Sequence, residues 1–441
     1  MRFSTSELAS HLDATLVGPD VTVDGASIDS RTIERGQLFV PIVADRDGHD
    51  FIPAALDAGA AAYLTQRDAE GATAVVVDDT AVALMNLGVL ARRRVGGVIG
   101  ITGSVGKTTT KDLLRACLAT TFPTAASEGS FNNELGLPLT LLNAADDARW
   151  AVLEMGARGV GHIKRLALVA RPDVGVVTSV AMAHVEFFGD LDGVARAKSE
   201  LVTALPPTGV AVLNFDDARV ARMAALSPCP VLGYAIETQA EVRAEGVELD
   251  GDLRPRFTLV TPWGKGEVRL ALHGAQQVPD ALAAAAAALW CEVPFERVAA
   301  ALGEATASAL RMEVRRVPNG PTLVVDCYNA NPASTEAALR ALAALEGGRK
   351  VALLGLMAEL GAETGAEHRR MAALADELGI ELAGYRTDLY GGPTEVTDVD
   401  GAVALLRTLA AGDAALVKGS RVARLEDVVG AYESGLRSVG G

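Results

Sequence analysis

The chain has 441 residues, of which 49% are apolar and 22% are charged, which is the balance of an ordinary globular protein. This length predicts two to four domains, because single cores rarely grow that large. The formal net charge is −16 and no block of like charge dominates. Nucleic acid is therefore disfavoured as a bulk partner, since a phosphate backbone requires a basic face. A phosphorylated small molecule is still compatible, because a few local cations and backbone N–H groups suffice to bind it.

The cysteines and the apolar stretches predict a cytoplasmic protein. Cys117, Cys229, Cys291 and Cys327 lie far apart without CxxC or zinc-like spacing, so reduced thiols are predicted rather than disulfides. The N-terminus lacks the basic segment and the apolar stretch after it that mark a signal peptide, so no signal peptide is predicted. The longest apolar stretch, Ala281–Trp290, is about half as long as a membrane span.

Residues 1–90 are predicted to form a first domain of short strands that ends in a long helix. The expected strands are Val21–Val23, Gln37–Val40, Ala62–Leu64 and Ala74–Val77, and the expected helices are Pro53–Gly59 and Thr80–Arg94.

Residues 91–308 alternate apolar strands with helical patterns, which predicts a parallel sheet covered by helices on both faces. The segment Glu241–Leu270 instead has short strands separated by Pro and Gly, which predicts an antiparallel insertion. The expected strands are Val98–Thr102, Ala151–Glu154, Val174–Thr178 and Val210–Asn214, and the expected helices include Lys111–Leu118 and Val278–Trp290.

Residues 309–441 restart the alternation and predict a separate, doubly wound domain of ordinary size. The expected strands are Thr322–Asp326, Lys350–Leu354 and Ala414–Lys418, and the expected helices are Ser334–Leu345 and Glu367–Leu378. The whole chain is thus predicted to be an α/β protein of three domains without internal repeats.

The sharpest local pattern is the glycine-rich stretch Gly100–Thr110, between an apolar strand and a helical pattern. Glycines allow a backbone to fold tightly around phosphate, and the helix N-terminus adds its positive end. Lys107 can neutralise the β- and γ-phosphates, and the Thr108 hydroxyl can ligate Mg²⁺. The spacing is shorter than the usual GxxxxGK[ST], because Ile101 stands where the first glycine is expected. A turn that binds nothing is the alternative, but the order strand, Gly-Lys-Thr, helix favours ATP binding.

Three further residues are candidates for metal binding. Glu154 ends a predicted strand, where a second magnesium ligand belongs in a phosphate-loop protein, although a solvated glutamate fits the position as well. His184 follows the next strand and could ligate metal, contact phosphate or be structural, whereas His162 is expected at the surface. Lys198 is expected from composition to be an exposed lysine. No Ser-His-Asp or Cys-His arrangement stands out, which fits a reaction that proceeds by positioning and charge stabilisation.

Together with the phosphate loop, several stretches resemble the Mur ligases of bacterial cell-wall synthesis, over nearly the whole chain. They are Ser130–Pro138, Tyr328–Pro332, Met357–Gly361 and Val417–Arg421. They are similar in particular to the branch that adds D-alanyl-D-alanine to UDP-N-acetylmuramoyl-tripeptide. The resemblance implies an N-terminal domain for the UDP moiety, a central ATPase domain and a C-terminal Rossmann-like domain that closes over both. It also implies an acyl-phosphate intermediate in peptidoglycan precursor synthesis.

The same resemblance implies roles for individual residues. The ATP-binding residues would be Gly103, Ser104, Val105, Gly106, Lys107, Thr108, Thr109, Asn329 and Asn331. The substrate-binding residues would be Ser30, Arg31, Asn132 and Asn133. Thr108, Glu154, His184 and Lys198 would hold two Mg²⁺ ions, and Lys107, Lys198, His184 and Glu154 would be catalytic. Lys198 matches a lysine that the family carries as a carbamate. An unmodified lysine would be a cation facing Mg²⁺, whereas a carbamate is an anionic oxygen ligand. Arg311 would mark the hinge into the last domain.

The sequence also departs from the family pattern. Gln276 stands where His is usual and Asp280 where Asn is usual, which places the contacts to the adenine in question. Val325 and Leu356 each replace a frequent Asp, although Asp326 is retained. None of these positions belongs to the phosphate loop or to the proposed metal ligands.

Other functions fit the sequence less well. A ligase that adds a diamino acid typically carries an Asp-Asn-Pro-Arg motif, which is absent here, and folylpolyglutamate synthase usually has Gly-Lys-Gly in its loop. A non-catalytic nucleotide-binding partner of a cell-wall protein would have no need for Lys107, Glu154 and Lys198. The expected partners are therefore the UDP-linked tripeptide and D-alanyl-D-alanine, and the expected state is a monomer.

Overall fold

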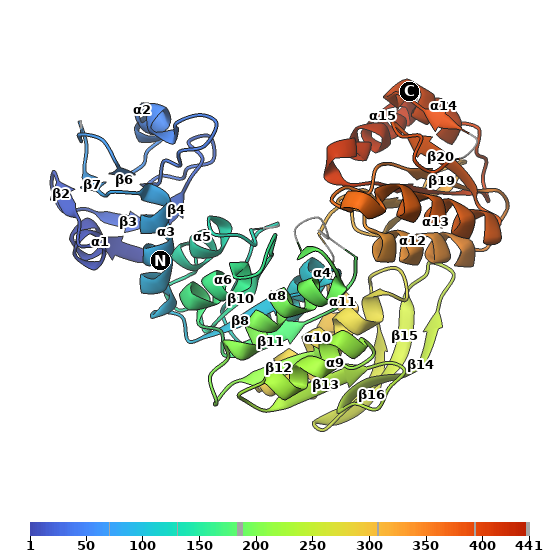
Figure 1. The fold of residues 1–441 in the computed structure, drawn as a ribbon, viewed down its shortest axis with the longest axis horizontal. Helices are drawn as coiled ribbons and strands as arrows, with labels where there is room; N and C mark the ends of the chain where they lie inside the picture. The colour runs from blue at the N-terminus through green and yellow to red at the C-terminus, as the bar shows by residue number, and fades with distance from the viewer. Residues whose placement is uncertain (70, 130, 183–187, 307, 392–393, 438–441) are drawn as a thin grey trace.

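The computed structural model describes residues 1–69, 71–129, 131–182, 188–306, 308–391 and 394–437. Three units follow one another along the chain, each with its own sheet, and the two outer units stand on the central one (Figure 1). All three larger sheets contain parallel strands accompanied by helices, so the predicted α/β class is confirmed.

The N-terminal unit has a five-stranded sheet in the order β2-β7-β6-β5-β4 beside a two-stranded ladder of β1 and β3. The predicted strands and helices of this unit are present, and three short elements before residue 18 add to them. The strands are β1 (Arg2–Ser4), β2 (Thr15–Val17), β3 (Thr22–Asp24), β4 (Ala26–Ser27), β5 (Leu38–Phe39), β6 (Ala62–Thr65) and β7 (Ala74–Val76). The helices are α1 (Thr5–Leu12), α2 (Ile52–Asp57) and α3 (Thr80–Arg92).

Helix α3 joins the N-terminal unit to the central unit. The Asp79 side chain accepts hydrogen bonds from two N–H groups of its first turn and so fixes where the helix begins. Leu84 and Leu87 are fully buried in one cluster with Leu137 and Leu166 of the central unit. The two units therefore share a common apolar core. Burial of each such leucine contributes about 2 kcal/mol to its stability.

The central unit has a nine-stranded sheet in the order β16-β15-β14-β13-β12-β11-β8-β10-β9. Strand β14 pairs parallel with β13, and only β15 and β16 are antiparallel additions at the edge. The segment predicted as an antiparallel insertion therefore continues the same sheet, because its first strand retains the parallel direction. The strands are β8 (Gly97–Thr102), β9 (Thr124–Ala126), β10 (Trp150–Glu154), β11 (Val174–Val177), β12 (Val210–Asn214), β13 (Val231–Ala235), β14 (Val242–Leu249), β15 (Pro255–Thr261) and β16 (Gly264–Arg269).

Helices cover both faces of the central sheet, as its buried apolar strands predicted. Ile99 and Ile101 point into the cluster beneath α4, α10 and α11, whereas Val98 points to the cluster beneath α3, α5 and α6. This alternation follows from the two-residue period of a strand. The helices are α4 (Lys107–Ala119), α5 (Gly136–Leu142), α6 (His162–Ala170), α8 (Leu191–Thr203), α9 (Ala218–Arg222), α10 (Gln277–Trp290) and α11 (Phe295–Glu304).

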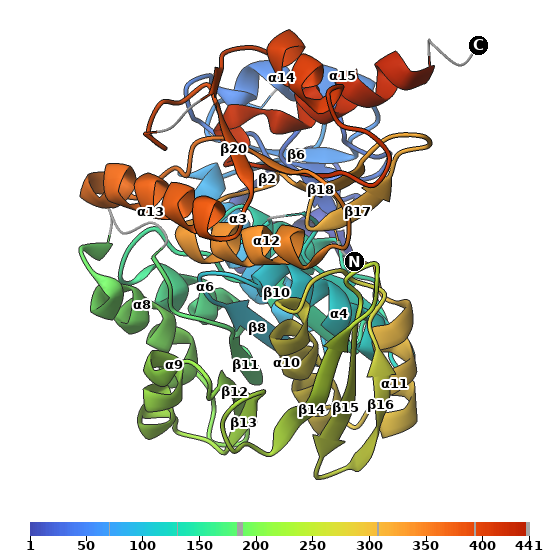
Figure 2. The same cartoon turned by 90° about the vertical axis from the view of Figure 1, so that its right-hand side faces the viewer.

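The C-terminal unit has a six-stranded sheet in the order β17-β18-β22-β19-β20-β21, with only β17 antiparallel. Helices α12 and α13 cover one face, and α14 and α15 cover the other (Figure 2). The strands are β17 (Glu313–Arg316), β18 (Thr322–Asp326), β19 (Lys350–Leu354), β20 (Glu381–Tyr385), β21 (Glu395–Val396) and β22 (Ala414–Lys418). The helices are α12 (Pro332–Ala344), α13 (Thr364–Glu377), α14 (Val399–Leu406) and α15 (Leu425–Arg437).

The central and C-terminal units also touch through a turn. Leu253, between β14 and β15, is 2% exposed and packs into the C-terminal core beside Met312. Within the described residues, none of the helices combines the length and apolar character that a bilayer crossing requires.

Candidate active site

The phosphate loop connects β8 to α4 and is held from two sides. Gly103 and Gly106 have φ values of +155° and +87°, which side chains rarely adopt. A Cβ at Gly103 would lie 1.7 Å from Thr178 Oγ1, and a Cβ at Gly106 would lie 2.1 Å from Asp280 Oδ1. The loop is therefore built on glycine because β11 and α10 approach it closely. Helix α4 begins at Lys107, one turn before the predicted helical pattern Lys111–Leu118, and Lys107 Nζ donates to the Gly103 carbonyl at 2.8 Å.

A line of hydrogen bonds joins the loop to the neighbouring strand. Thr108 Oγ1 donates to Glu154 Oε2 at 2.8 Å, and Asn132 Nδ2 donates to Glu154 Oε1 at 3.0 Å. Glu154 ends β10, directly beside β8, and is only 2% exposed. The structure thus brings together three of the predicted site residues and leaves Glu154 buried rather than solvated.

Arg311 extends this line from the start of the C-terminal unit. Its Nη2 donates to Thr108 Oγ1 at 3.0 Å, and its guanidinium carbon lies 4.1 Å from the centre of the Tyr328 ring. Arg311 is expected from the family resemblance only to mark a hinge, but it contacts the phosphate loop itself. Sequence pattern could not find this contact, because nothing in the local spacing links residue 311 to residue 108.

Lys198 lies on α8 and is 6% exposed, so the exposure expected from composition is wrong. Burial, followed by the like charge of Lys107, holds the pKa of Lys198 well below its ordinary value. Burial likewise lowers the pKa of Lys107, with Glu154 opposing the shift. His184 falls outside the described residues, so its predicted role stays a prediction.

Asp280, which departs from the family pattern, lies in the first turn of α10. Asp280 is 8% exposed and packs against Gly106, and Thr110 Oγ1 donates to its Oδ1 at 3.4 Å. Burial raises the pKa of Asp280 to about 8, although Thr110, Arg311 and Lys107 favour its charged form. A protonated carboxyl group can donate a hydrogen bond, as the amide of an asparagine would.

The remaining departures are Gln276, Val325 and Leu356, of which Val325 is buried and the other two are partly buried. Gln276 Nε2 is buried without a hydrogen-bond partner in the described part of the chain. Val325 is fully buried in β18, where an apolar residue suits the core, and the Leu356 carbonyl accepts from the Ser420 N–H at 2.9 Å.

The predicted residues of the C-terminal unit gather at the carboxyl ends of β18 and β22. Lys418 Nζ donates to Asp326 Oδ2 at 2.6 Å and to the Asn329 carbonyl at 3.0 Å. The Asn331 side chain accepts from the Ser334 N–H at 2.9 Å and caps α12. This edge is the usual ligand-binding edge of a doubly wound sheet.

The predicted substrate residues divide between two units. Asn133 Oδ1 accepts from two backbone N–H groups at the start of α5, and Asn132 reaches Glu154. Ser30 and Arg31 follow β4 in the N-terminal unit. The Arg31 guanidinium hydrogen-bonds Asp29 and holds the pKa of that carboxyl at about 2.

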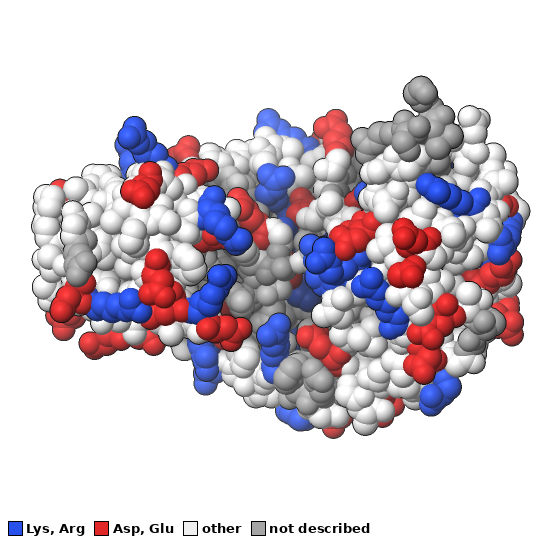
Figure 3. All heavy atoms as spheres, turned by 90° about the horizontal axis from the view of Figure 1, so that it is seen from above, with Lys and Arg blue, Asp and Glu red and all other residues white. Residues whose placement is uncertain are grey.

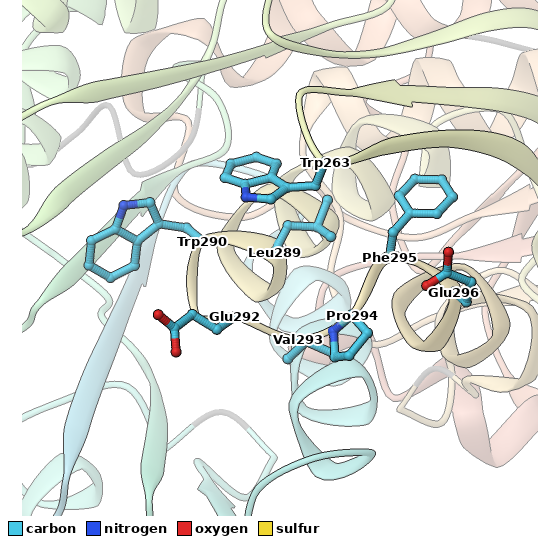
Figure 4. Close-up of a pocket in the computed structure, with 8 residues that line it drawn as sticks. All are labelled: Trp263, Leu289, Trp290, Glu292, Val293, Pro294, Phe295 and Glu296. Carbon is cyan, nitrogen blue, oxygen red and sulfur yellow. The ribbon is translucent and has the colours of Figure 1, made fainter.

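The surface between the outer units is hollowed, and Lys and Arg side chains gather along it (Figure 3). A cavity of about 470 Å³ lies elsewhere, at the end of α10. Figure 4 shows Trp263 above Leu289, with Trp290 and Phe295 to either side. Trp290 ends α10, so this cavity lies about 15 Å from Asp280 along the helix. Its charged lining is acidic, which disfavours phosphate.

The described side chains suit a magnesium–nucleotide complex. No cluster of three His, Cys, Asp or Glu side chains occurs in the described ranges. Magnesium at a nucleotide site needs no such cluster, because phosphate and water oxygens complete its coordination. The Thr108 hydroxyl and the Glu154 carboxylate place two oxygen atoms of the kind that can ligate Mg²⁺ 2.8 Å apart at the head of a helix.

Comparisons with known families identify both larger parts of the chain. The description "Mur ligase middle domain" matches residues 101–288, and "Mur ligase, glutamate ligase domain" matches residues 310–421. The chain belongs to the Mur ligase family. The family resemblance predicted from its motifs is thus confirmed.

Relatives within the Mur ligase family cover nearly the whole chain. The UDP-N-acetylmuramoyl-tripeptide–D-alanyl-D-alanine ligase of Mycobacterium tuberculosis is 40% identical over 91% of each chain. The ligase of the same name from Escherichia coli is 33% identical and covers 97% of this chain and 98% of its own.

Solved structures agree with this assignment. MurF of Acinetobacter baumannii superimposes with a TM-score of 0.89 at 28% identity, covering 98% of this chain and 99% of its own. MurF of Thermotoga maritima in complex with ADP gives 0.84 at 26% identity, covering 94% and 98%. The chain therefore shares the three-domain architecture of these Mur ligases.

Proposed function

We propose that this chain is the ATP-dependent ligase that adds D-alanyl-D-alanine to UDP-N-acetylmuramoyl-tripeptide in peptidoglycan precursor synthesis. The observation that carries the proposal is the line Arg311–Thr108–Glu154 at the head of α4, in a member of the Mur ligase family. Its relatives with this activity are 33–40% identical over most of their length. ATP is the energy source, as the family and the ADP complex of a relative indicate.

The phosphate loop would bind the triphosphate. Backbone N–H groups from Gly103 to Thr109 and the N-terminus of α4 would surround the phosphates, with Lys107 balancing their charge. Arg311 adds a second cation at Thr108, where it would meet the γ-phosphate. Asn329 and Asn331 would meet the nucleotide from the C-terminal unit.

Thr108, Glu154, His184 and Lys198 are the proposed magnesium ligands. When bound, magnesium would supply positive charge that offsets the negative charge of the phosphates. Lys198 fits this role as a carbamate, because burial beside Lys107 lowers its pKa and so favours the neutral amine, which is the form that adds CO2. The carbamate then supplies an anionic oxygen, whereas an ammonium group would repel the metal.

The three units would divide the substrates. We assign residues 1–90 to the UDP-linked substrate, with Ser30 and Arg31 as contacts, 91–308 to ATP, and 309–441 to a unit that closes over both. Asn132 and Asn133 would orient the peptide near Glu154, since Asn132 already contacts that carboxylate. We place the protein in the cytoplasm and expect a monomer.

The reaction would proceed in two balanced steps. The terminal carboxylate of the tripeptide attacks the γ-phosphorus and forms an acyl phosphate with release of ADP. The amine of D-alanyl-D-alanine then attacks the acyl carbon, loses a proton and displaces phosphate. Lys107 and Arg311 stabilise the charge on the transferred phosphoryl group, which is the main demand on the protein in phosphoryl transfer.

The test is phosphate release with each substrate omitted in turn. We expect release only when ATP, the UDP-linked tripeptide and the dipeptide are all present. Lys107→Ala should reduce the rate at least about 100-fold, because one charged group at a developing charge contributes that much. The surface variant Lys164→Ala is the matched control, and circular dichroism verifies folding. Full turnover without dipeptide would contradict the assignment.

A further inference from the structure

A cluster of cationic and aromatic side chains lies at the edge of the C-terminal unit that faces the phosphate loop. Arg421 follows β22, and its guanidinium carbon lies 6.0 Å from the centre of the Tyr328 ring. The same ring lies 4.1 Å from the guanidinium carbon of Arg311, which donates to Thr108. The guanidinium carbons of Arg421 and Arg311 are therefore at most about 10 Å apart.

Arg311 and Lys418 already bind protein groups, whereas the Arg421 side chain is largely exposed. Lys418 is buried and donates to Asp326 and to the Asn329 carbonyl. Among the residues that the structure describes, Arg421 forms one ion pair, at 3.3 Å, with Glu426, and its side chain is 62% exposed. A guanidinium group has five N–H donors in a planar fork that matches a carboxylate, so a single pairing leaves donors available.

Glu426 and Tyr328 would hold this fork in place. The Glu426 side chain is three-quarters buried, and its Oε2 has no hydrogen-bond partner in the described part of the chain. Contact with a largely buried carboxylate and with an aromatic ring restricts the guanidinium, which lowers the entropy lost when it binds an anion.

The amine substrate of the proposed ligase requires a cationic group that binds its carboxylate. Its amine must approach an acyl carbon among phosphates and carboxylates, while its other end carries a negative charge that those groups repel. An extended dipeptide spans about 7 Å. This length fits within the upper limit of about 10 Å between the guanidinium carbons of Arg311, beside the phosphate loop, and Arg421.

We propose that Arg421, held by Tyr328 and Glu426, binds the C-terminal carboxylate of the incoming dipeptide and so orients its amine toward the acyl phosphate. This inference rests on the ligase activity proposed above. Arg421 thereby determines amine-substrate specificity, because it favours binding of a substrate whose free carboxylate lies one dipeptide length from its amine.

The experiment is a cycle that crosses two enzymes with two substrates. Wild type and Arg421→Ala are assayed with D-alanyl-D-alanine and with its C-terminal amide, which lacks the negative charge. Loss of one charged hydrogen-bonded pair should raise the KM for the dipeptide about 10- to 100-fold in Arg421→Ala. Wild type should show a similar rise with the amide, and the variant should show no further rise with it. The KM for ATP should stay unchanged in every combination.

Two further variants guard against a structural explanation. Arg424→Ala removes an exposed arginine of the same turn, which pairs with Asp427, and should leave the dipeptide KM unchanged. Arg421→Lys keeps the charge without the fork and should give an intermediate KM. The thermal midpoint of each variant is measured alongside, and the amide arm on wild type gives a result even if a variant folds poorly.

The outcomes separate this inference from the ligase assignment. If wild type consumes ATP with the dipeptide but Arg421→Ala loses equally on acid and amide, the assignment of Arg421 is wrong and the ligase assignment stands. An equally large effect of Arg424→Ala would also overturn the role of Arg421. If wild type shows no dipeptide-dependent turnover at all, the ligase assignment itself fails.

Discussion

At the scale of single residues, burial sets the chemistry of Lys198. A charged ammonium group is expensive to hold at 6% exposure beside a second lysine, so the neutral amine is favoured. A neutral amine adds CO2, and we therefore expect a carbamate at Lys198 near neutral pH. Protein equilibrated with ¹³C-labelled bicarbonate should show a carbamate carbon signal that Lys198→Arg lacks, and activity should fall when CO2 is removed. A signal that persists in the variant would place the carbamate elsewhere.

Asp280 gives a prediction for the pH dependence of stability. Its folded pKa of about 8 lies above the ordinary value of 3.8, so its contribution is fully present below pH 3.8 and is lost as the pH rises through 8. Asp280→Asn removes this linkage while preserving shape. We expect its gain in free energy of unfolding over wild type to grow from about pH 5 to about pH 8, on the order of a few kcal/mol.

Denaturant titrations of both proteins across this range measure that difference. Asp192→Asn is the control, because its carboxylate is 69% exposed and meets only a surface arginine. Parallel curves for Asp280→Asn and wild type would show that Asp280 is charged in the folded protein.

At the scale of elements, Asn331 caps a helix and is proposed to meet the nucleotide, and substitution can separate the observed role from the proposed one. Its side-chain oxygen caps α12, and Ser334 completes a capping box. Asn331→Ala should lower the free energy of unfolding by about 1 kcal/mol, whereas Asn331→Asp should keep the cap. If the side-chain amide meets the nucleotide, Asn331→Asp should still weaken ATP binding, since its charge repels phosphate. Calorimetry of ATP binding beside thermal unfolding distinguishes the two roles.

The elements that sequence predicted best are those whose burial shows in the pattern. Strands β8, β10 and β12 are continuous apolar runs, and their observed bounds lie within one residue of the prediction. Among the elements that were not predicted are the short ones at the N-terminus and the helix α11. Each of these buries only a few side chains, as with α11, where Val298, Ala301 and Leu302 are buried, so little periodicity marks it.

At the scale of the whole molecule, Arg311 links the C-terminal unit to the phosphate loop. We expect an ATP analogue together with the UDP-linked tripeptide to bring the outer units closer, because each substrate would be held between units. Small-angle X-ray scattering should then show a smaller radius of gyration. Arg311→Ala should reduce this decrease in the radius of gyration, because the variant loses the proposed contact between Arg311 and the γ-phosphate of the nucleotide.

Arg316→Ala is the control for that experiment. Arg316 pairs with Asp252 across the same boundary between units, but the pair is largely exposed, and such pairs contribute about 0–1 kcal/mol. An equal loss of closure in both variants would mean that any contact at this boundary suffices, and would contradict a specific role for Arg311.

The sequence by itself determined the phosphate loop, the buried strands and the membership of the Mur ligase family. These features are local: glycines permit the turn, apolar runs predict buried strands, and motifs stand in contiguous stretches. Lys107, Thr108 and Glu154 could therefore be placed at one sheet edge before any coordinates were known.

Only the tertiary structure decided which distant residues meet at that edge. Arg311 reaches Thr108, Asp280 packs on Gly106, and Lys198 is buried rather than exposed. Contacts of this kind depend on how helices and units pack, and burial in turn sets pKa values and the strength of charge interactions. The one-dimensional pattern contains the residue types, but distance and desolvation, which determine their chemistry, arise only when the chain is folded.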